Sequence, residues 1–353
     1  MANTNGNMNF MKNIILSSLV CLLVFVHCTT NEKPIKGAKL DITINNENVI
    51  DSLIVYDKEN SWDIMGCYRF ADANMISDTL QVTQNKIYKM YFFTDGMQQE
   101  LGEIYLGPNS RNAFQMDKND PYASINFQGT YAAINNYFAY ARNIENILSE
   151  QVKNGISQED LQVELAEKKE MVLQKGKSEQ ISDSLVDYTK NKFEKFSSIL
   201  VKKNSKYLYK RSLIGTVGNN FVFQDANKKP VSLQDYKGKY VYIDVWATWC
   251  KPCKEEYVHL KDLEAYFSDT EAIAILSVSI DKDFSTWYNY LTSALLEGTQ
   301  LHCGLENPFV TFYDIGALPR FLFLDKEGKV ISADEIRPSN ERLKSYLQSY
   351  LKK

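Results

Sequence analysis

The stretch YVYIDVWATWCKPC at residues 240–253 decides the fold of this chain. Its first half, 240–246, is a nearly continuous apolar run, which is typical of a central β-strand covered on both faces. Cys250 and Cys253 follow, at the point where a helix is expected to begin and to run from Pro252 to about Phe267. Cysteines three residues apart lie on one side of a first helical turn, so a disulfide between them requires little backbone movement. This context predicts a redox-active cysteine pair.

The start of a helix favours a reactive thiolate at Cys250. Unpaired N–H groups and the partial positive charge of the helix N-terminus lower the pKa of the leading cysteine. Pro252 suits the first turn because it has no N–H to satisfy, and Lys251 adds a positive charge that solvent screens. We expect Cys250 to attack a substrate disulfide and Cys253 to resolve the mixed disulfide that forms.

Two carboxylates are candidates to accept the proton of Cys253. Asp244 interrupts the apolar strand, where burial would raise its pKa towards neutrality. Glu256 lies about one helical turn after Cys253 on a similar face. The alternatives are a hydrogen-bonded structural acid at Asp244 and an ordinary surface acid at Glu256.

The sequence around the cysteines alternates between strand and helix patterns. A second buried strand is expected over 272–280, and a turn at 326–328 separates two further strands of a hairpin. Helices are expected over 284–296 and 342–351. Residues 211–353 are therefore predicted to form a layered α/β domain, a central sheet flanked by helices.

At these residues the chain resembles the thioredoxin superfamily, and within it the TlpA/ResA-type reductases of the bacterial cell envelope. The resemblance covers about Val217 to Leu351 and rests on residues 242–253, with a matching approach at Phe221, 231–233 and 237–239. It implies a thioredoxin-like fold in which Cys250 attacks and Cys253 resolves. It also identifies Asp244 with the buried acid of thioredoxins and Glu256 with the acid of the envelope branch.

The resemblance also implies a substrate-binding loop. Leu318-Pro319 matches the family's cis-proline loop, which faces the disulfide and pairs with substrate backbone. Trp249, Lys251 and Pro252 are the further expected substrate contacts. Two residues depart from the pattern: Val258 replaces a usual proline, and the bulky Leu318 precedes Pro319.

The part of the chain before residue 211 has different sequence patterns. Residues 29–130 contain short alternating strands separated by turn signals, which suggests a small β-sandwich-like domain without a catalytic constellation. Residues 131–210 have helical spacing and are expected to form a helical linker, with Ser157 capping one helix.

Residues 1–28 are predicted to be a targeting signal. Lys12 precedes an apolar run of signal-peptide length, too short for a typical membrane span. The run ends at His27-Cys28, which resembles a bacterial lipoprotein signal with lipid attached to Cys28, although His27 stands where a small residue is usual. A simple cleaved signal and an uncleaved anchor are the alternatives. Each delivers the body of the chain to an oxidising, periplasm-facing space.

Composition narrows the function further. The 353 residues are 44% hydrophobic and 24% charged with a net charge of −4, so nothing indicates nucleic-acid binding. Only Cys250 and Cys253 of the six cysteines form a motif. The chain has no second such pair and only three histidines, which argues against zinc, and we expect no metal and no cofactor beyond the disulfide itself. His302-Cys303 is interpreted as a scattered thiol beside a histidine.

The predicted function is a thiol–disulfide oxidoreductase that acts on exported proteins. Its expected partners are disulfide-containing clients, a membrane thiol donor of electrons, and the membrane itself through a lipid anchor. One alternative is a thiol peroxidase of the AhpC/TSA type, which the sequence Trp249-Cys250 disfavours because those enzymes carry Thr-x-x-Cys. Another is a binding module with a passenger thioredoxin domain.

Overall fold

The computed structural model describes residues 37–45, 50–57, 59, 63–70, 74–94, 96–218 and 220–352. The predicted leader and its Cys28 lie outside this range. The chain divides into two compact units, Met1–Val201 and Lys202–Lys353. No helix within the described ranges is both long and apolar enough to cross a membrane.

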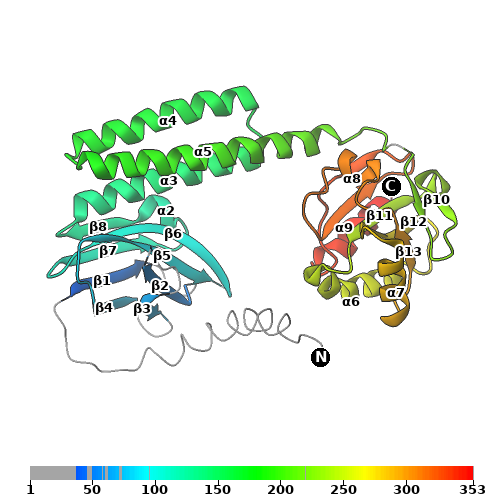
Figure 1. The fold of residues 1–353 in the computed structure, drawn as a ribbon, viewed down its shortest axis with the longest axis horizontal. Helices are drawn as coiled ribbons and strands as arrows, with labels where there is room; N and C mark the ends of the chain where they lie inside the picture. Colours follow the sequence, from blue (N-terminus) through cyan, green and yellow to red (C-terminus); the bar gives the residue numbers. More distant parts are fainter. Residues whose placement is uncertain are drawn as a thin grey trace, which may run out of the picture. The chain divides into compact units, whose positions relative to one another are not determined.

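The N-terminal unit contains two four-stranded sheets, which confirms the predicted β-rich domain (Figure 1). Their orders are β4-β1-β7-β8 and β3-β2-β5-β6. Alternate residues of β1, such as Leu40 and Ile42, share one core with Leu53 and Met90 of the second sheet. The strands are β1 Ala38–Asn45, β2 Ser52–Asp57, β3 Ile64–Arg69, β4 Met75–Leu80, β5 Lys86–Thr94, β6 Met97–Leu106, β7 Arg111–Asp117 and β8 Asn126–Gly129.

Helices complete this unit, and α3 packs against β6, β8 and α4. Apolar residues at helical spacing, from Tyr137 to Leu148, form the buried stripe of α3. Ser157 caps α4 by accepting a hydrogen bond from the Asp160 N–H, as the sequence predicts. The helices are α2 Pro121–Ser124, α3 Ala132–Asn154, α4 Gln158–Ser178 and α5 Asp183–Ser212, and the boundary between the two units lies within α5.

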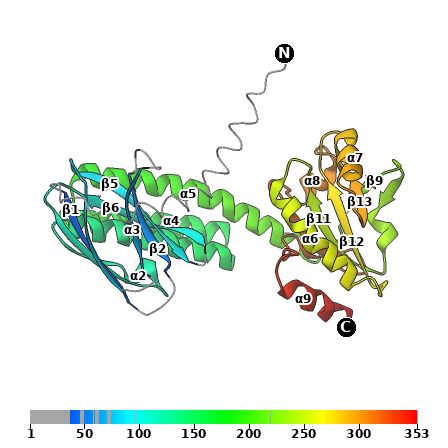
Figure 2. The ribbon, with the colours of Figure 1, turned by 90° about the horizontal axis from the view of Figure 1, so that it is seen from below.

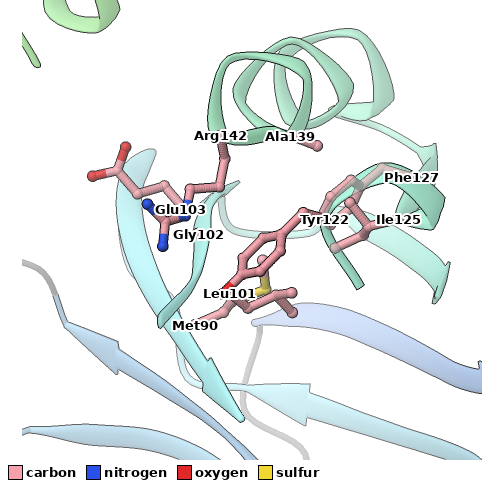
Figure 3. Close-up of a pocket in the computed structure, with 9 residues that line it drawn as sticks. All are labelled: Met90, Leu101, Gly102, Glu103, Tyr122, Ile125, Phe127, Ala139 and Arg142. Atoms are coloured by element: carbon pink, nitrogen blue, oxygen red, sulfur yellow. The ribbon is translucent and has the colours of Figure 1, made fainter. Parts of the chain in front are cut away.

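A polar cluster joins β6 to the helices of the N-terminal unit. Glu103 of β6 is almost fully buried and accepts hydrogen bonds from Tyr188 and Lys192 of α5. Arg142 of α3 lies beside it and forms an ion pair of 3.1 Å with Glu145. Figure 3 shows the adjoining cavity, whose volume of about 10 Å³ has room for about one water molecule. This cluster therefore holds helices against a sheet.

The C-terminal unit is built on a seven-stranded sheet of order β10-β9-β13-β12-β11-β14-β15. Figure 2 labels its strands β9, β13, β12 and β11. The central strand β11 is parallel to β12 and antiparallel to β14. The strands are β9 Val222–Gln224, β10 Pro230–Ser232, β11 Tyr240–Trp246, β12 Ile273–Ser279, β13 Thr299–His302, β14 Arg320–Leu324 and β15 Val330–Ser332, with a short 3-10 turn at Leu233–Tyr236.

Helices cover both faces of this sheet. The helices are α6 Lys251–Tyr266, α7 Phe284–Ser293, α8 Pro308–Phe312 and α9 Arg342–Leu351. Tyr242 of β11 packs with Leu260 of α6 and Leu347 of α9 on one face. Ile243 shares the opposite face with Trp287 of α7 and with α8. Because side chains alternate along a strand, the continuous apolar run at 240–246 supplies both cores. The predicted α/β sheet with helices on both faces is confirmed.

Candidate active site

Cys250 and Cys253 form a disulfide at the N-terminus of α6. Cys250 is the N-cap residue, and its Sγ accepts a hydrogen bond of 3.2 Å from the Cys253 N–H. Both cysteines are about 95% buried, at 4% and 5% exposure. A sulfur that already accepts a backbone N–H at a helix start is placed where a thiolate is stabilised.

The loop before β14 lies at the same end of the sheet as the cysteines. Val245, near the end of β11, pairs with Arg320 at the start of the antiparallel strand β14. The Leu318–Pro319 peptide bond immediately precedes Arg320 and is cis, as predicted. Both residues are half-buried. The register therefore brings this loop beside the segment that leads from β11 to Cys250.

The side chains next to the disulfide differ in exposure. Trp249 is 65% exposed, whereas Trp246 at the end of β11 is 5% exposed. Trp246 therefore packs in the core, and Trp249 presents an aromatic surface to solvent. Lys251 and Pro252 are also exposed. Lys251 forms a long, solvent-exposed ion pair of 3.7 Å with Glu255, so it contributes little fixed charge at the sulfurs.

Asp244 is buried on the face of β11 that α6 covers. Its exposure is 7%, and burial raises its pKa from the usual 3.8 to about 8. Within this rise of the pKa, the negative charge of Glu256 adds to the effect of burial, while the nearby Ser277 hydroxyl opposes it. The predicted direction of this shift is confirmed. A carboxyl with this pKa exchanges protons readily with a thiol, whose ordinary pKa is about 8.5.

Glu256 is held by the loop that precedes α9. Its carboxylate accepts hydrogen bonds of 2.9 Å from both the N–H and the hydroxyl of Ser339. Arg337 lies 3.7 Å away and completes the set. These bonds occupy both carboxylate oxygens, so Glu256 influences the site mainly through its charge on Asp244.

A buried carboxylate that the sequence does not single out holds the loop before Cys250. Asp281, 2% exposed, accepts hydrogen bonds from the N–H of Thr248 at 2.9 Å and from its hydroxyl at 2.7 Å. Ser279 donates a third bond of 2.7 Å. Asp281 therefore fixes the backbone two residues before Cys250. The available signal was its position just after a parallel strand that adjoins β11, where functional loops gather.

His302 and Cys303 do not add a second redox pair. The His302 ring nitrogen Nε2 lies 2.7 Å from the Asp281 carbonyl oxygen, and its ring packs against Trp287. Burial raises the pKa of the Cys303 thiol to about 12. Because the nucleophile in disulfide exchange is the thiolate, Cys303 is a poor candidate for that reaction.

Comparisons with known proteins find relatives of part of this chain. A model of the AhpC/TSA family matches residues 214–333. The thiol-disulfide oxidoreductase ResA of Bacillus cereus is 31% identical over 142 residues, which are 38% of this chain and 77% of that protein. ResA of Bacillus subtilis is 30% identical over 119 residues, or 33% and 64% of the two chains.

A solved structure also aligns with a little over a third of this chain. It is the thioredoxin domain of a thiol-disulfide oxidoreductase from Bacteroides vulgatus, which is 26% identical. The alignment covers 39% of this chain and 96% of that domain, with a TM-score of 0.35.

The sheet, the disulfide at a helix start and the cis-proline loop define a dithiol oxidoreductase of the thioredoxin class. The identity with ResA proteins, which extends over most of their length, makes the assignment more specific. The chain belongs to the TlpA/ResA-type thiol-disulfide oxidoreductases.

Proposed function

We propose that this enzyme reduces or exchanges disulfides in exported proteins on the periplasm-facing side of the cell envelope. The observation that carries the proposal is the Cys250–Cys253 disulfide at the start of α6, beside the Leu318–Pro319 loop. The predicted leader and the predicted lipid attachment at Cys28 support this location, because both are export signals. An exported protein also meets conditions in which disulfides persist.

The reaction proceeds in two exchanges. The Cys250 thiolate attacks a client disulfide and expels one client sulfur as a thiol, which leaves a mixed disulfide. The ionised form of Asp244 then accepts the proton of Cys253, and the Cys253 thiolate attacks the Cys250 sulfur. This restores the Cys250–Cys253 disulfide and releases the reduced client. The Leu318–Pro319 loop and Trp249 contact the client during the exchange.

A membrane thiol carrier returns two electrons to the enzyme after each cycle. The cysteine pair itself stores these electrons, so the cycle requires no organic cofactor and no metal. Lipid at Cys28 keeps the enzyme at the membrane where this carrier acts.

The central test is reduction of a protein disulfide by the full chain in the presence of dithiothreitol. Cys250→Ser is expected to abolish the reaction, because it removes the attacking sulfur. Cys253→Ala is expected to trap clients as mixed disulfides that a thiol reductant releases. Full activity of Cys250→Ser would contradict the function. Partners that co-purify without any disulfide link would instead favour a binding module.

The lipid anchor has a separate test. Growth of the producing bacterium with a labelled fatty acid is expected to label the protein and to leave it in the membrane fraction. Cys28→Ala should lose the label. An unlabelled protein released in soluble form would indicate a simple cleaved signal.

The family model that matches residues 214–333 keeps a second function in view, that of a thiol peroxidase. Trp249-Cys250 stands where such enzymes carry Thr-x-x-Cys, and Cys250 is paired rather than alone. Consumption of hydrogen peroxide at a rate comparable to disulfide reduction, lost in Cys250→Ser, would favour the peroxidase.

A further inference from the structure

The loop that contains the cis peptide bond connects α8 to β14. This cis-proline loop, residues 313–319, includes Leu318 and Pro319 and lies beside the segment that leads to Cys250. Its middle is anchored in the core of the unit by the buried Ile315, and Leu318 packs against the same core. Its two ends are contacted by another element, the last turns of α5.

The last turns of α5 are fixed to the C-terminal unit. Residues 202–212 of the helix belong to this unit. Leu213, directly after the helix, is buried in the same core cluster as Ile315. The Gly215 N–H then donates to the Val330 carbonyl of β15 at 2.8 Å. Core packing and this hydrogen bond together give the end of α5 a defined position against the sheet.

One face of these turns lies along the start of the cis-proline loop. The Tyr209 hydroxyl donates to the carbonyl of Phe312, the last residue of α8, at 2.8 Å. Lys206 is three residues earlier and is therefore on the same face of the helix. Its ammonium lies 3.8 Å from the place that a Cβ at Gly316 of the loop would occupy. The helix therefore contacts both the residue before the loop and the loop itself.

A carboxylate joins the same helix to the end of the loop. Arg320 directly follows Pro319 and is 7% exposed, and a guanidinium at this depth requires partners. It donates to the Ala333 carbonyl at 3.2 Å and lies 3.5 Å from Oδ1 of Asp334. The other carboxylate oxygen, Oδ2, accepts a hydrogen bond of 2.7 Å from Lys210 of α5. Asp334 therefore bridges the helix to the residue next to the cis-proline.

This bridge matters for position more than for stability. Asp334 is more than half exposed, and ion pairs at such sites add little to the free energy of unfolding. Lys210 and Arg320 are mostly buried, so the bridge fixes where the loop ends. A client backbone that pairs with the loop requires its donors and acceptors in register, and small displacements of such groups cost much in rate.

We propose that Lys210 and Asp334 are positioning residues, through which the end of α5 holds the cis-proline loop in place for the backbone of a client. This inference rests on the proposed function and deepens it, because it assigns the alignment of the client to a helix as well as to the loop. Neither residue takes part in the exchange of sulfurs. Their loss should therefore slow the attack on a peptide disulfide and spare the attack on a small disulfide without a peptide backbone.

Two disulfides with the same leaving group separate alignment from chemistry. One is dithiobis(nitrobenzoate), and the other is a short peptide whose single cysteine carries the same nitrothiobenzoate group. All proteins are full-length and carry Cys253→Ser, so that only the attack by Cys250 remains. The Cys250 thiolate forms a disulfide with the peptide sulfur, and the coloured nitrothiobenzoate leaves as a thiolate. Stopped flow gives the two rate constants, and a Cys250→Ala protein gives the contribution of the other thiols.

The two variants should be slowed with the peptide alone. We expect Lys210→Met and Asp334→Asn each to lower the rate constant with the peptide by about fivefold or more, and to leave that with dithiobis(nitrobenzoate) within about twofold. The two substitutions change the net charge in opposite directions, so a shared effect excludes electrostatic steering as its cause. Lys210→Arg keeps the charge and should keep most of the rate with the peptide.

Lys169→Met is the matched control. Lys169 also forms an ion pair of 2.7 Å, with Glu194 of α5, but both residues belong to the N-terminal unit. This variant should react with both disulfides as the Cys253→Ser parent protein does.

A parent-like ratio of the two rate constants in both Lys210→Met and Asp334→Asn would overturn the proposal. Equal slowing with both disulfides would also overturn it, since that result indicates a changed Cys250 rather than a displaced loop. The same loss of rate with the peptide in Lys169→Met would have the same consequence. If Asp334→Asn does not fold, Lys210→Met decides the question alone. A parent protein that reacts with neither disulfide would instead refute the proposed function.

Discussion

Asp244 carries a carboxyl group into the apolar centre of the sheet, where the neutral form is favoured. The folded protein therefore retains a proton at pH 7 that an unfolded chain would release, because burial raises the pKa from 3.8 to about 8. The neutral acid stabilises the fold fully below the ordinary pKa. This contribution is lost as the pH rises towards the raised value.

Asp244→Asn should remove this pH dependence, because asparagine does not ionise. We expect the stability of the variant relative to the parent protein to increase between about pH 4 and pH 8 and then to level off. The total gain is expected to be a few kcal/mol, since one pKa unit corresponds to about 1.4 kcal/mol. Urea unfolding of the oxidised proteins, followed by tryptophan fluorescence across this range, measures it. A difference that stays constant with pH would show that Asp244 ionises normally.

Thr248 gives a second prediction at the scale of single residues. Thr248→Val keeps the side-chain shape but removes the hydroxyl that donates to Asp281 at 2.7 Å. Leaving a buried carboxylate oxygen without this donor should cost about 1–3 kcal/mol of the free energy of unfolding. Thr248→Ser retains the hydroxyl and should recover most of the loss. Equal stability of the two variants would show that the hydrogen bond contributes nothing.

The sequence identified some residues of the site more readily than others. The spacing of Cys250 and Cys253 is a local signal, and so is the interruption of an apolar strand by Asp244. Asp281 has no such signal, since it reaches Thr248 across 33 positions of the chain. Glu256 was predicted on the right helical face, but its bonds to Ser339 depend on tertiary folding. A periodic sequence pattern does not indicate which distant segments come into contact.

At the scale of elements, α6 and β11 place the redox centre. The helix begins where the central strand ends, and its buried side chains fasten it to the sheet. Leu260, 2% exposed, is one of these anchors, whereas Val258 on the same helix is 64% exposed. The orientation of the helix N-terminus, and with it the thiolate, depends on such packing.

Truncation of Leu260 and of Val258 should distinguish a buried anchor of the helix from an exposed side chain. Leu260→Ala is expected to cost about 2–5 kcal/mol because it leaves a cavity beneath α6. Val258→Ala should change stability by less than about 0.5 kcal/mol. Denaturant midpoints of the two variants, with unchanged slopes, provide the comparison. Equal losses at both positions would contradict the packing of α6 described above.

Strongly periodic elements were predicted closely. The strand at 240–246 and the helix at 342–351 have the bounds expected from sequence, and α6 begins one residue before the predicted Pro252. The short elements β13 and α8 were missed because four or five residues contain too little periodicity to distinguish strand, helix and loop. In the N-terminal unit the β-rich character was predicted, but the strands β3, β4 and β7 were not assigned individually.

At the scale of the whole molecule, the chemistry belongs to one of two compact units. The cysteines, Asp244 and the Leu318–Pro319 loop all lie within Lys202–Lys353. This unit has its own sheet and its own cores on both faces. The described residues of the N-terminal unit include no cysteine pair.

A fragment of residues 202–353 should therefore retain the intrinsic redox reaction. We expect the reduced fragment to reduce dithiobis(nitrobenzoate) at a rate within about twofold of that of the full chain, because rates follow local geometry. Circular dichroism checks that the fragment is folded. A folded fragment that fails to react would show that the N-terminal unit completes the site.

The proposed chemistry depends above all on the ionisation of Cys250 at the start of α6. The reduced protein is alkylated with iodoacetamide across a range of pH, and mass spectrometry gives the rate at Cys250. We predict a midpoint clearly below the free-cysteine value of about 8.5, because the start of the helix stabilises the thiolate. A midpoint at or above 8.5 in the parent protein would contradict the account.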